Sequence, residues 1–129
     1  MAVIGGLGGR ADQAFSLLHH LYAASRDAAL ASGDVYLVAG ESVVFVLHRG
    51  KNVIRTPRGP GLLGENVGII PVARPAVVTT RGLEWDVEGW ATELGAQVST
   101  SNHIRGEVVE VETTERVLFT VEVAQRAGE

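Results

Sequence analysis

The sequence contains no cysteine and a single lysine, and aromatic residues make up only 5% of its 129 residues. Without cysteine the chain has no disulfide, no thiolate metal site and no cysteine nucleophile. Basic residues are also in the minority, with 11 Lys and Arg against 15 Asp and Glu and a formal net charge of −4. This balance disfavours a nucleic-acid-binding surface, so we expect no nucleic-acid partner.

Long apolar runs are missing as well. The longest apolar region, residues 35–47, is interrupted by Gly40-Glu41-Ser42 and is too short to span a bilayer. No charged segment followed by an apolar run marks a signal peptide. We therefore expect a soluble, cytoplasmic protein with no membrane partner. Apolar residues still make up 46% of the chain, which is enough for a real core and excludes wholesale disorder.

Glycine, in contrast, is concentrated at four positions near the start: Gly5, Gly6, Gly8 and Gly9. A helical pattern begins directly afterwards, near Arg10. Glycines let a ligand approach the backbone closely, and the free N–H groups at a helix start favour an anion such as phosphate. Arg10 adds a charged donor, and Asp12 fits beside phosphate if Mg²⁺ lies between them. The competing interpretation is a glycine-rich turn that opens an ordinary helix.

The two common phosphate-binding motifs fit this chain poorly. Gly6, Gly8 and Ala11 satisfy the spacing of the dinucleotide-binding pattern, but the chain after the helix has an antiparallel pattern. A P-loop needs Lys followed by Ser or Thr, whereas Lys51 is followed by Asn52. The glycine-rich stretch is therefore a candidate phosphate site of neither type.

The rest of the chain predicts one amphipathic helix, over residues 10–26, and many short strands. We expect the strands at residues 35–39, 42–48, 52–55, 67–72, 76–80, 109–113 and 117–123. Residues 56–66 are predicted to be a surface loop and residues 81–95 to be irregular. Many short strands at regular spacing favour an antiparallel β-sandwich or jelly roll, so the fold class is mostly β.

Three further features refine this prediction. The strand around residues 43–47 is apolar on both faces and is expected to be covered on both sides. Gly40-Glu41 predicts a hairpin, and Thr114-Glu115-Arg116 predicts a second hairpin between the last two strands. His19 and His20 are adjacent, so they point about 100° apart around a helix and cannot form a same-face metal pair.

Two polar stretches stand out from the strands. In residues 79–87, Trp85 lies between Glu84 and Asp86, and acidic neighbours would attract a cation to a stacking surface. The alternative is a Trp that caps the core. In residues 97–103, hydroxyl and amide side chains can donate and accept hydrogen bonds together. The alternative for that stretch is a turn or a helix N-cap.

Four ordered stretches together resemble the C-terminal part of the thiamine pyrophosphokinases. They are Gly5-Gly6-x-Gly8-Gly9-Arg10-x-Asp12-Gln13, residues 68–72, residues 80–86 and residues 98–102. The resemblance covers nearly the whole chain. It implies that residues 1–33 are the C-terminal remnant of an α/β nucleotide-binding domain, and that residues 34–129 form a thiamine-binding β-sandwich.

The resemblance also implies an activity and a set of site residues. The family moves a diphosphate group from ATP to the hydroxyl of thiamine with Mg²⁺ and releases AMP, in a homodimer whose sites are shared between subunits. The residues implied for the ATP phosphates are Gly5, Gly6, Gly8, Gly9 and Gln13. Arg10 and Asp12 are implied to be catalytic, with Asp12 as the Mg²⁺ ligand. The residues implied for thiamine are Trp85, Ser99, Ser101 and Asn102.

One departure from the family limits what we expect of this chain. The family also uses an Asp-x-Asp pair to hold Mg²⁺, and no Asp-x-Asp occurs here. We therefore expect either a fragment that is inactive alone or a chain that has lost catalysis. Two other functions remain open. One is a non-catalytic module that binds a small aromatic cation. The other is a structural domain without a ligand, in which Trp85 and Asn102 would be buried and bonded to each other.

Overall fold

The structure is a computed structural model that describes residues 2–6, 10–27, 34–57 and 63–123. Its elements, in chain order, are β1 (Ala2–Gly6), α1 (Ala11–Ala24), β2 (Val35–Ala39), β3 (Ser42–Leu47), β4 (Gly50–Arg55), β5 (Leu63–Ile70), β6 (Ala76–Arg81), β7 (Trp90–Thr92), β8 (Ser99–His103), β9 (Val108–Thr113) and β10 (Val117–Val123). The prediction of a mostly β fold with one helix is confirmed.

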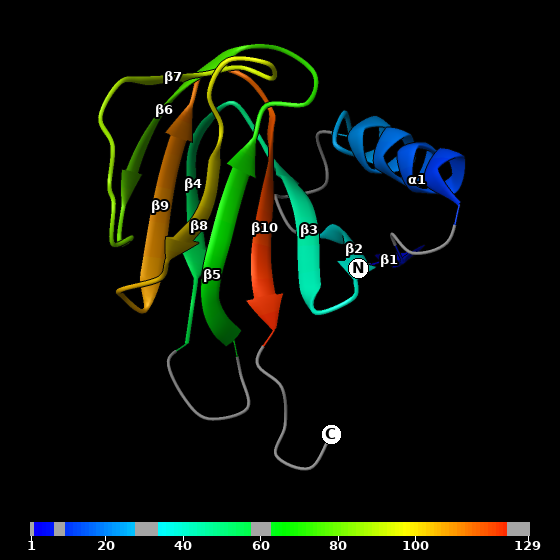
Figure 1. Cartoon of the computed structure of the whole chain (residues 1–129), viewed down its shortest axis with the longest axis horizontal. Coiled ribbons are helices and arrows are strands. Elements are labelled where there is room, and N and C mark those ends of the chain that lie inside the picture. The colour runs from blue at the N-terminus through cyan, green and yellow to red at the C-terminus, as the bar shows by residue number, and fades with distance from the viewer. Residues whose placement is uncertain (1, 7–9, 28–33, 58–62, 124–129) are drawn as a thin grey trace.

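The described strands form two sheets that pack face to face (Figure 1). The six-stranded sheet has the order β1-β2-β3-β10-β5-β8, and the four-stranded sheet has the order β4-β9-β6-β7. Strand β1 pairs with β2 in parallel, whereas the other pairs of described strands are antiparallel. The fold is thus an antiparallel β-sandwich with a β-α-β unit at one edge.

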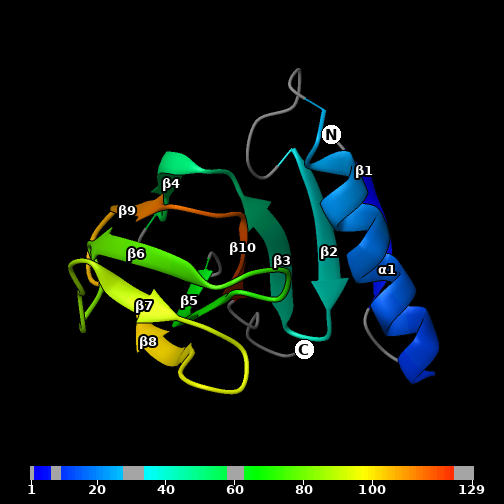
Figure 2. The ribbon, with the colours of Figure 1, turned by 90° about the horizontal axis from the view of Figure 1, so that it is seen from above.

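Helix α1 covers one end of the six-stranded sheet. It packs on β1, β2 and β3, on the side away from the four-stranded sheet (Figure 2). Leu21 is fully buried, and Leu17 and Leu18 pack partly against the same cluster. The helical spacing of these leucines gives α1 its apolar stripe. No helix in the described part of the chain is long and apolar enough to cross a membrane.

Strands β3 and β10 are buried on both faces, because they lie between two hydrophobic cores. Phe45 and Phe119 face the four-stranded sheet, with ring centroids 5.4 Å apart. Val44 and Leu118 face the opposite way, into the smaller core under α1. The prediction that residues 43–47 are covered on both sides is confirmed. Burying each such side chain stabilises the fold by about 1.5–3 kcal/mol.

The predicted hairpin between the last two strands is wrong. Strand β9 pairs with β4 and β6, whereas β10 pairs with β3 and β5 in the other sheet. The connection at residues 114–116 therefore crosses from one sheet to the other. The alternating pattern correctly gives the buried face, since Val111 and Phe119 share the main core. It does not give the pairing partner.

Other boundaries differ from the predictions in smaller ways. The hairpin at Gly40-Glu41 is confirmed by the antiparallel pairing of β2 and β3. Strand β5 begins at Leu63, inside the predicted surface loop. Strand β7 lies within residues 81–95, which were expected to be irregular. The stretch around Ser99–His103 is an edge strand, β8, and not a turn or a helix N-cap.

Candidate functional site

A pocket of about 290 Å³ lies where the β8 edge of one sheet meets the β7 edge of the other. The residues that line it are Ile69, Val78, Thr80, Trp85, Val87, Trp90, Val98, Ser99, Thr100 and Asn102. None of these side chains is charged, and two are indoles. A mostly apolar hollow with a few hydroxyl and amide groups is typical of a site for a small aromatic ring.

The loop that carries Trp85 is organised by Asp86. Its carboxylate accepts hydrogen bonds from the hydroxyl of Thr80 at 3.1 Å and from the backbone N–H groups of Gly82 at 3.2 Å and Leu83 at 3.0 Å. The hydroxyl of Thr80 in turn accepts from the N–H of Val87 at 3.1 Å. Asp86, expected as an acidic neighbour of Trp85 that attracts a cation, therefore also holds the loop in place.

Gly82 gives the loop its bend. Its φ of +99° lies in the left-handed region that side chains rarely adopt. A Cβ at this position would lie 2.4 Å from the carbonyl oxygen of Val108. The next residues then run antiparallel to the end of β8, through a bridge between Leu83 and Ile104. This alignment sets Trp85 opposite Asn102.

The side-chain amide of Asn102 is hydrogen-bonded to the backbone of Trp85. The N–H of Trp85 donates to Asn102 Oδ1 at 3.1 Å, and Asn102 Nδ2 donates to the carbonyl of Trp85 at 3.0 Å. Asn102 is only 6% exposed, whereas Trp85 is 56% exposed. Trp85 therefore does not cap the core. Asn102, predicted to contact a ligand, lines the pocket and also holds the loop in place.

The predicted hydroxyl residues separate onto two surfaces. Ser99 lines the pocket together with Thr100 and Trp85. Ser101, which has a φ of +56°, instead lines a different hollow with Thr120 and Glu122 on the outer face of the six-stranded sheet. The structure thus brings three of the four predicted thiamine residues together and leaves Ser101 outside the pocket.

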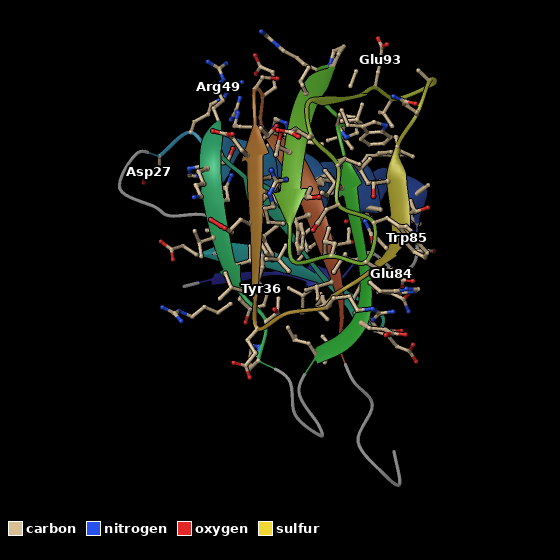
Figure 3. The ribbon with its side chains drawn as sticks, turned by 90° about the vertical axis from the view of Figure 1, so that its left-hand side faces the viewer. Asp27, Tyr36, Arg49, Glu84, Trp85 and Glu93 are labelled. Carbon is tan, nitrogen blue, oxygen red and sulfur yellow. The ribbon has the colours of Figure 1, made fainter. Side chains whose placement is uncertain are left out.

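A charged cluster that the sequence did not predict is centred on Glu84, which Figure 3 shows next to Trp85. Glu84 Oε1 is 2.5 Å from His103 Nδ1 and 2.6 Å from Arg105 Nη2, and Arg105 Nη1 is 2.9 Å from Glu65 Oε2. The hydrogen bond from His103, with Arg105 nearby, lowers the pKa of Glu84 below its usual value. A hydrogen bond from Arg105 likewise lowers the pKa of Glu65. Only the register of the strands joins these residues, so no local motif could have found them.

The predicted phosphate residues lie at the start of α1. Arg10 Nη2 is 2.5 Å from Asp12 Oδ2, and both side chains are mostly exposed. The N–H of Gln13 donates to Asp12 Oδ1 at 3.0 Å. Gly5 and Gly6 end β1, whereas Gly8 and Gly9 lie outside the described residues. Within the described ranges, no group of three or more His, Cys, Asp or Glu residues is arranged to hold a metal ion.

These two candidate regions lie at opposite edges of the six-stranded sheet. Strand β1 is the first strand of that sheet and β8 is the last. Five steps of about 4.8 Å between neighbouring strands place the edges roughly 24 Å apart along the sheet. Figure 2 shows α1 and β1 at one end of the molecule and β7 and β8 at the other.

Comparisons with known proteins place the chain among the thiamine pyrophosphokinases. The family model described as "Thiamin pyrophosphokinase, vitamin B1 binding domain" matches residues 51–118. The chain is 28% identical over 126 residues to the thiamine pyrophosphokinase of Saccharomyces cerevisiae, a match that covers 95% of this chain and 39% of that protein. It is 31% identical to thiamine pyrophosphokinase 1 of Arabidopsis thaliana, over 92% of this chain and 42% of that protein.

A solved structure shows the same architecture. The crystal structure of yeast thiamin pyrophosphokinase superposes with a TM-score of 0.82 at 29% sequence identity, over 95% of this chain and 39% of that chain. The chain spans less than half the length of the curated thiamine pyrophosphokinases named above.

Proposed function

We propose that the pocket beside Trp85 binds thiamine, because the chain belongs to the thiamin pyrophosphokinase family. The model of that family's vitamin B1 binding domain matches more than half of the sequence. The observation that carries this proposal is the location of the pocket inside the matched domain. All of its lining residues fall within residues 51–118.

The chemistry of the pocket suits the two rings of thiamine. Its aminopyrimidine is flat and carries hydrogen-bonding groups, and its thiazolium is a cation. The exposed indole of Trp85 offers a π-face for stacking or for cation–π contact. Ser99 and Asn102 provide groups that both donate and accept, which suits the ring nitrogens and the amino group.

The phosphates of ATP would bind at the start of α1. Arg10 would contact the phosphates of ATP, together with backbone N–H groups of Gly5 and Gly6, whereas the N–H of Gln13 donates to Asp12. Mg²⁺ is usually held by one or two carboxylates together with substrate phosphates, and the exposed carboxylate of Asp12 fits that role. When bound, Mg²⁺ neutralises charge on the transferred group. We propose that, by family, the chain contributes to the transfer of diphosphate from ATP to thiamine with release of AMP, a reaction that it does not complete alone.

The separation of the two regions supports a site shared between two copies of the chain. Diphosphate transfer needs the phosphates and the thiamine hydroxyl in contact. One chain holds Asp12 and Trp85 at opposite edges of a six-stranded sheet. We therefore propose a homodimer in which residues 1–33 of one copy face the 34–129 sandwich of the other, in the cytoplasm. Analytical ultracentrifugation at micromolar concentration tests this, and a purely monomeric chain would contradict it.

Calorimetric titration of thiamine into the 129-residue chain tests the binding site. We expect saturable binding that Ser99→Ala weakens about 2- to 10-fold, through the loss of one hydrogen bond of about 0.5–1.5 kcal/mol. Ser101→Ala is the matched control, because Ser101 lies outside the pocket and its loss should leave the affinity unchanged. No saturable binding by the wild-type chain, or equal weakening by both variants, would contradict the proposed site.

A further inference from the structure

His103 contacts the ring of Trp85 from outside the pocket. The centroids of the two rings are 5.1 Å apart, and their planes are tilted by 44°. Trp85 lines the pocket, whereas His103 is not among the lining residues. The imidazole therefore packs beside the indole without reaching the space that a ligand would fill.

The imidazole is oriented by its charged neighbours. A carboxylate can only accept a hydrogen bond, so the contact of 2.5 Å between Glu84 Oε1 and His103 Nδ1 places the hydrogen on Nδ1. The same carboxylate oxygen accepts from Arg105 at 2.6 Å. These contacts hold the imidazole beside the indole of Trp85.

The charged groups around His103 carry one more negative charge than positive charge. Among the described residues, the charged groups that face it are Glu84 from the loop, Glu65 from β5 and Arg105 beyond β8. Two carboxylates thus face one guanidinium, and the cluster carries a net charge of −1 while His103 is neutral. A protonated His103 brings the cluster to neutrality.

We propose that His103 is a positioning residue for Trp85, and that its protonation weakens the binding of a cationic aromatic ring in the pocket. This inference rests on the proposed thiamine site. An imidazolium beside the indole draws on the same π-electrons that a thiazolium would use, whereas a neutral imidazole does not. Affinity for thiamine is therefore lower when His103 is protonated than when it is neutral.

The test compares the wild-type chain with His103→Phe and His20→Phe. Phenylalanine keeps an aromatic ring beside Trp85 but cannot be protonated. His20 lies on α1, on the opposite side of the molecule from β8, so its replacement is the matched control for the loss of a histidine. Circular dichroism confirms that each variant is folded, and calorimetry gives the thiamine dissociation constant at about pH 6 and about pH 8.

We expect the wild type and His20→Phe to bind thiamine about 2- to 5-fold more weakly at the lower pH, which corresponds to a cation–π contribution at an exposed site. His103→Phe should bind equally well at both pH values. A His103→Phe variant that keeps the pH dependence of the wild type would overturn the proposal.

A second readout does not depend on thiamine. In a Trp90→Phe background the fluorescence comes from Trp85 alone, and an imidazolium in contact with an indole quenches its emission. We expect emission to fall on acidification, and this step to vanish in His103→Phe. If the wild type binds no thiamine but shows the step, the thiamine site fails and the positioning contact stands. If thiamine binds but no step occurs, the positioning role of His103 fails alone.

Discussion

The side-chain amide of Asn102 is hydrogen-bonded to both the N–H and the carbonyl of the Trp85 backbone. One side-chain amide accepts from the N–H of Trp85 at 3.1 Å and donates to its carbonyl at 3.0 Å, in the manner of a paired strand. The same Oδ1 also accepts from the N–H of His103 at 2.8 Å. Because Asn102 is buried and Trp85 is exposed, the amide fixes the base of a side chain that remains free to meet a ligand.

Replacing Asn102 should therefore affect both stability and binding. Asn102→Ala leaves up to three backbone groups without their partner, and each unsatisfied buried group costs about 1–3 kcal/mol where water cannot replace the amide. We expect a lower melting temperature together with weaker thiamine binding. Thermal melting by circular dichroism and calorimetric titration measure the two effects. A variant that melts like the wild type would show that water replaces the amide.

Replacing Trp85 should affect binding far more than stability. The side chain is 56% exposed, so Trp85→Ala should change the free energy of unfolding by at most about 1 kcal/mol. Loss of stacking worth about 1–3 kcal/mol should weaken thiamine binding roughly 10- to 100-fold. Melting and titration of the same variant separate the two effects. A large fall in melting temperature with unchanged affinity would place the pocket elsewhere.

Gly82 should not tolerate a side chain. Its positive φ alone costs a non-glycine residue about 1–2 kcal/mol, and the added Cβ would also strike the carbonyl oxygen of Val108 at 2.4 Å. Gly89→Ala is the matched control, because Gly89 has a φ of +57° but open space around it. We expect Gly82→Ala to lower the melting temperature clearly more than Gly89→Ala. Equal effects would mean that the loop moves away without cost.

Tyr22 should make the fold sensitive to alkaline pH. Burial raises the pKa of its hydroxyl from 10.0 to about 12, against the opposing effect of the Arg116 guanidinium. The folded state therefore keeps a proton that the unfolded state loses between pH 10.0 and about 12. The stabilisation is fully present below pH 10.0 and disappears as the pH rises through about 12. Urea unfolding across this range should show the decline in the wild type and a flatter curve in Tyr22→Phe.

The 129-residue chain alone should form no thiamine diphosphate. Beside Asp12, the sequence has no Asp-x-Asp to add further carboxylates for Mg²⁺, so the ion would have too few protein ligands. Incubation with ATP, Mg²⁺ and thiamine, followed by mass spectrometry, measures the product. Steady turnover above a control without protein would show that the carboxylate pair of the family is dispensable here.

Periodicity predicted the elements of this fold better than their partners. The two-faced apolar pattern of Val43–Leu47 correctly indicated a strand between two layers, because burial on both sides leaves no polar face. The alternating patterns of β9 and β10 correctly indicated their buried faces. They could not distinguish a hairpin from a crossover between sheets, because both connections bury the same residues. Glycine and proline near residues 56–66 signalled a loop, yet β5 begins within that stretch.

The candidate site shows the same limit. Trp85 and Ser99 were predicted from two polar stretches and from the family resemblance, and both line the pocket. The roles of Asp86 and Asn102 in holding the loop were not predicted. A carboxylate or an amide can bind either a ligand or a loop backbone, and only the backbone geometry distinguishes the two. The Glu84–His103 pair depends on two segments that run side by side although they are 19 residues apart in sequence.

The two-faced burial of β3 and β10 also determines how the molecule can open. Each strand contributes to the main core on one side and to the core beneath α1 on the other, so neither core can be exposed without disturbing the strands that bound both. The chain should therefore unfold as one cooperative unit, although its two candidate regions lie at opposite ends. The backbone amides of β3 and β10 should be the slowest in the protein to exchange with deuterium.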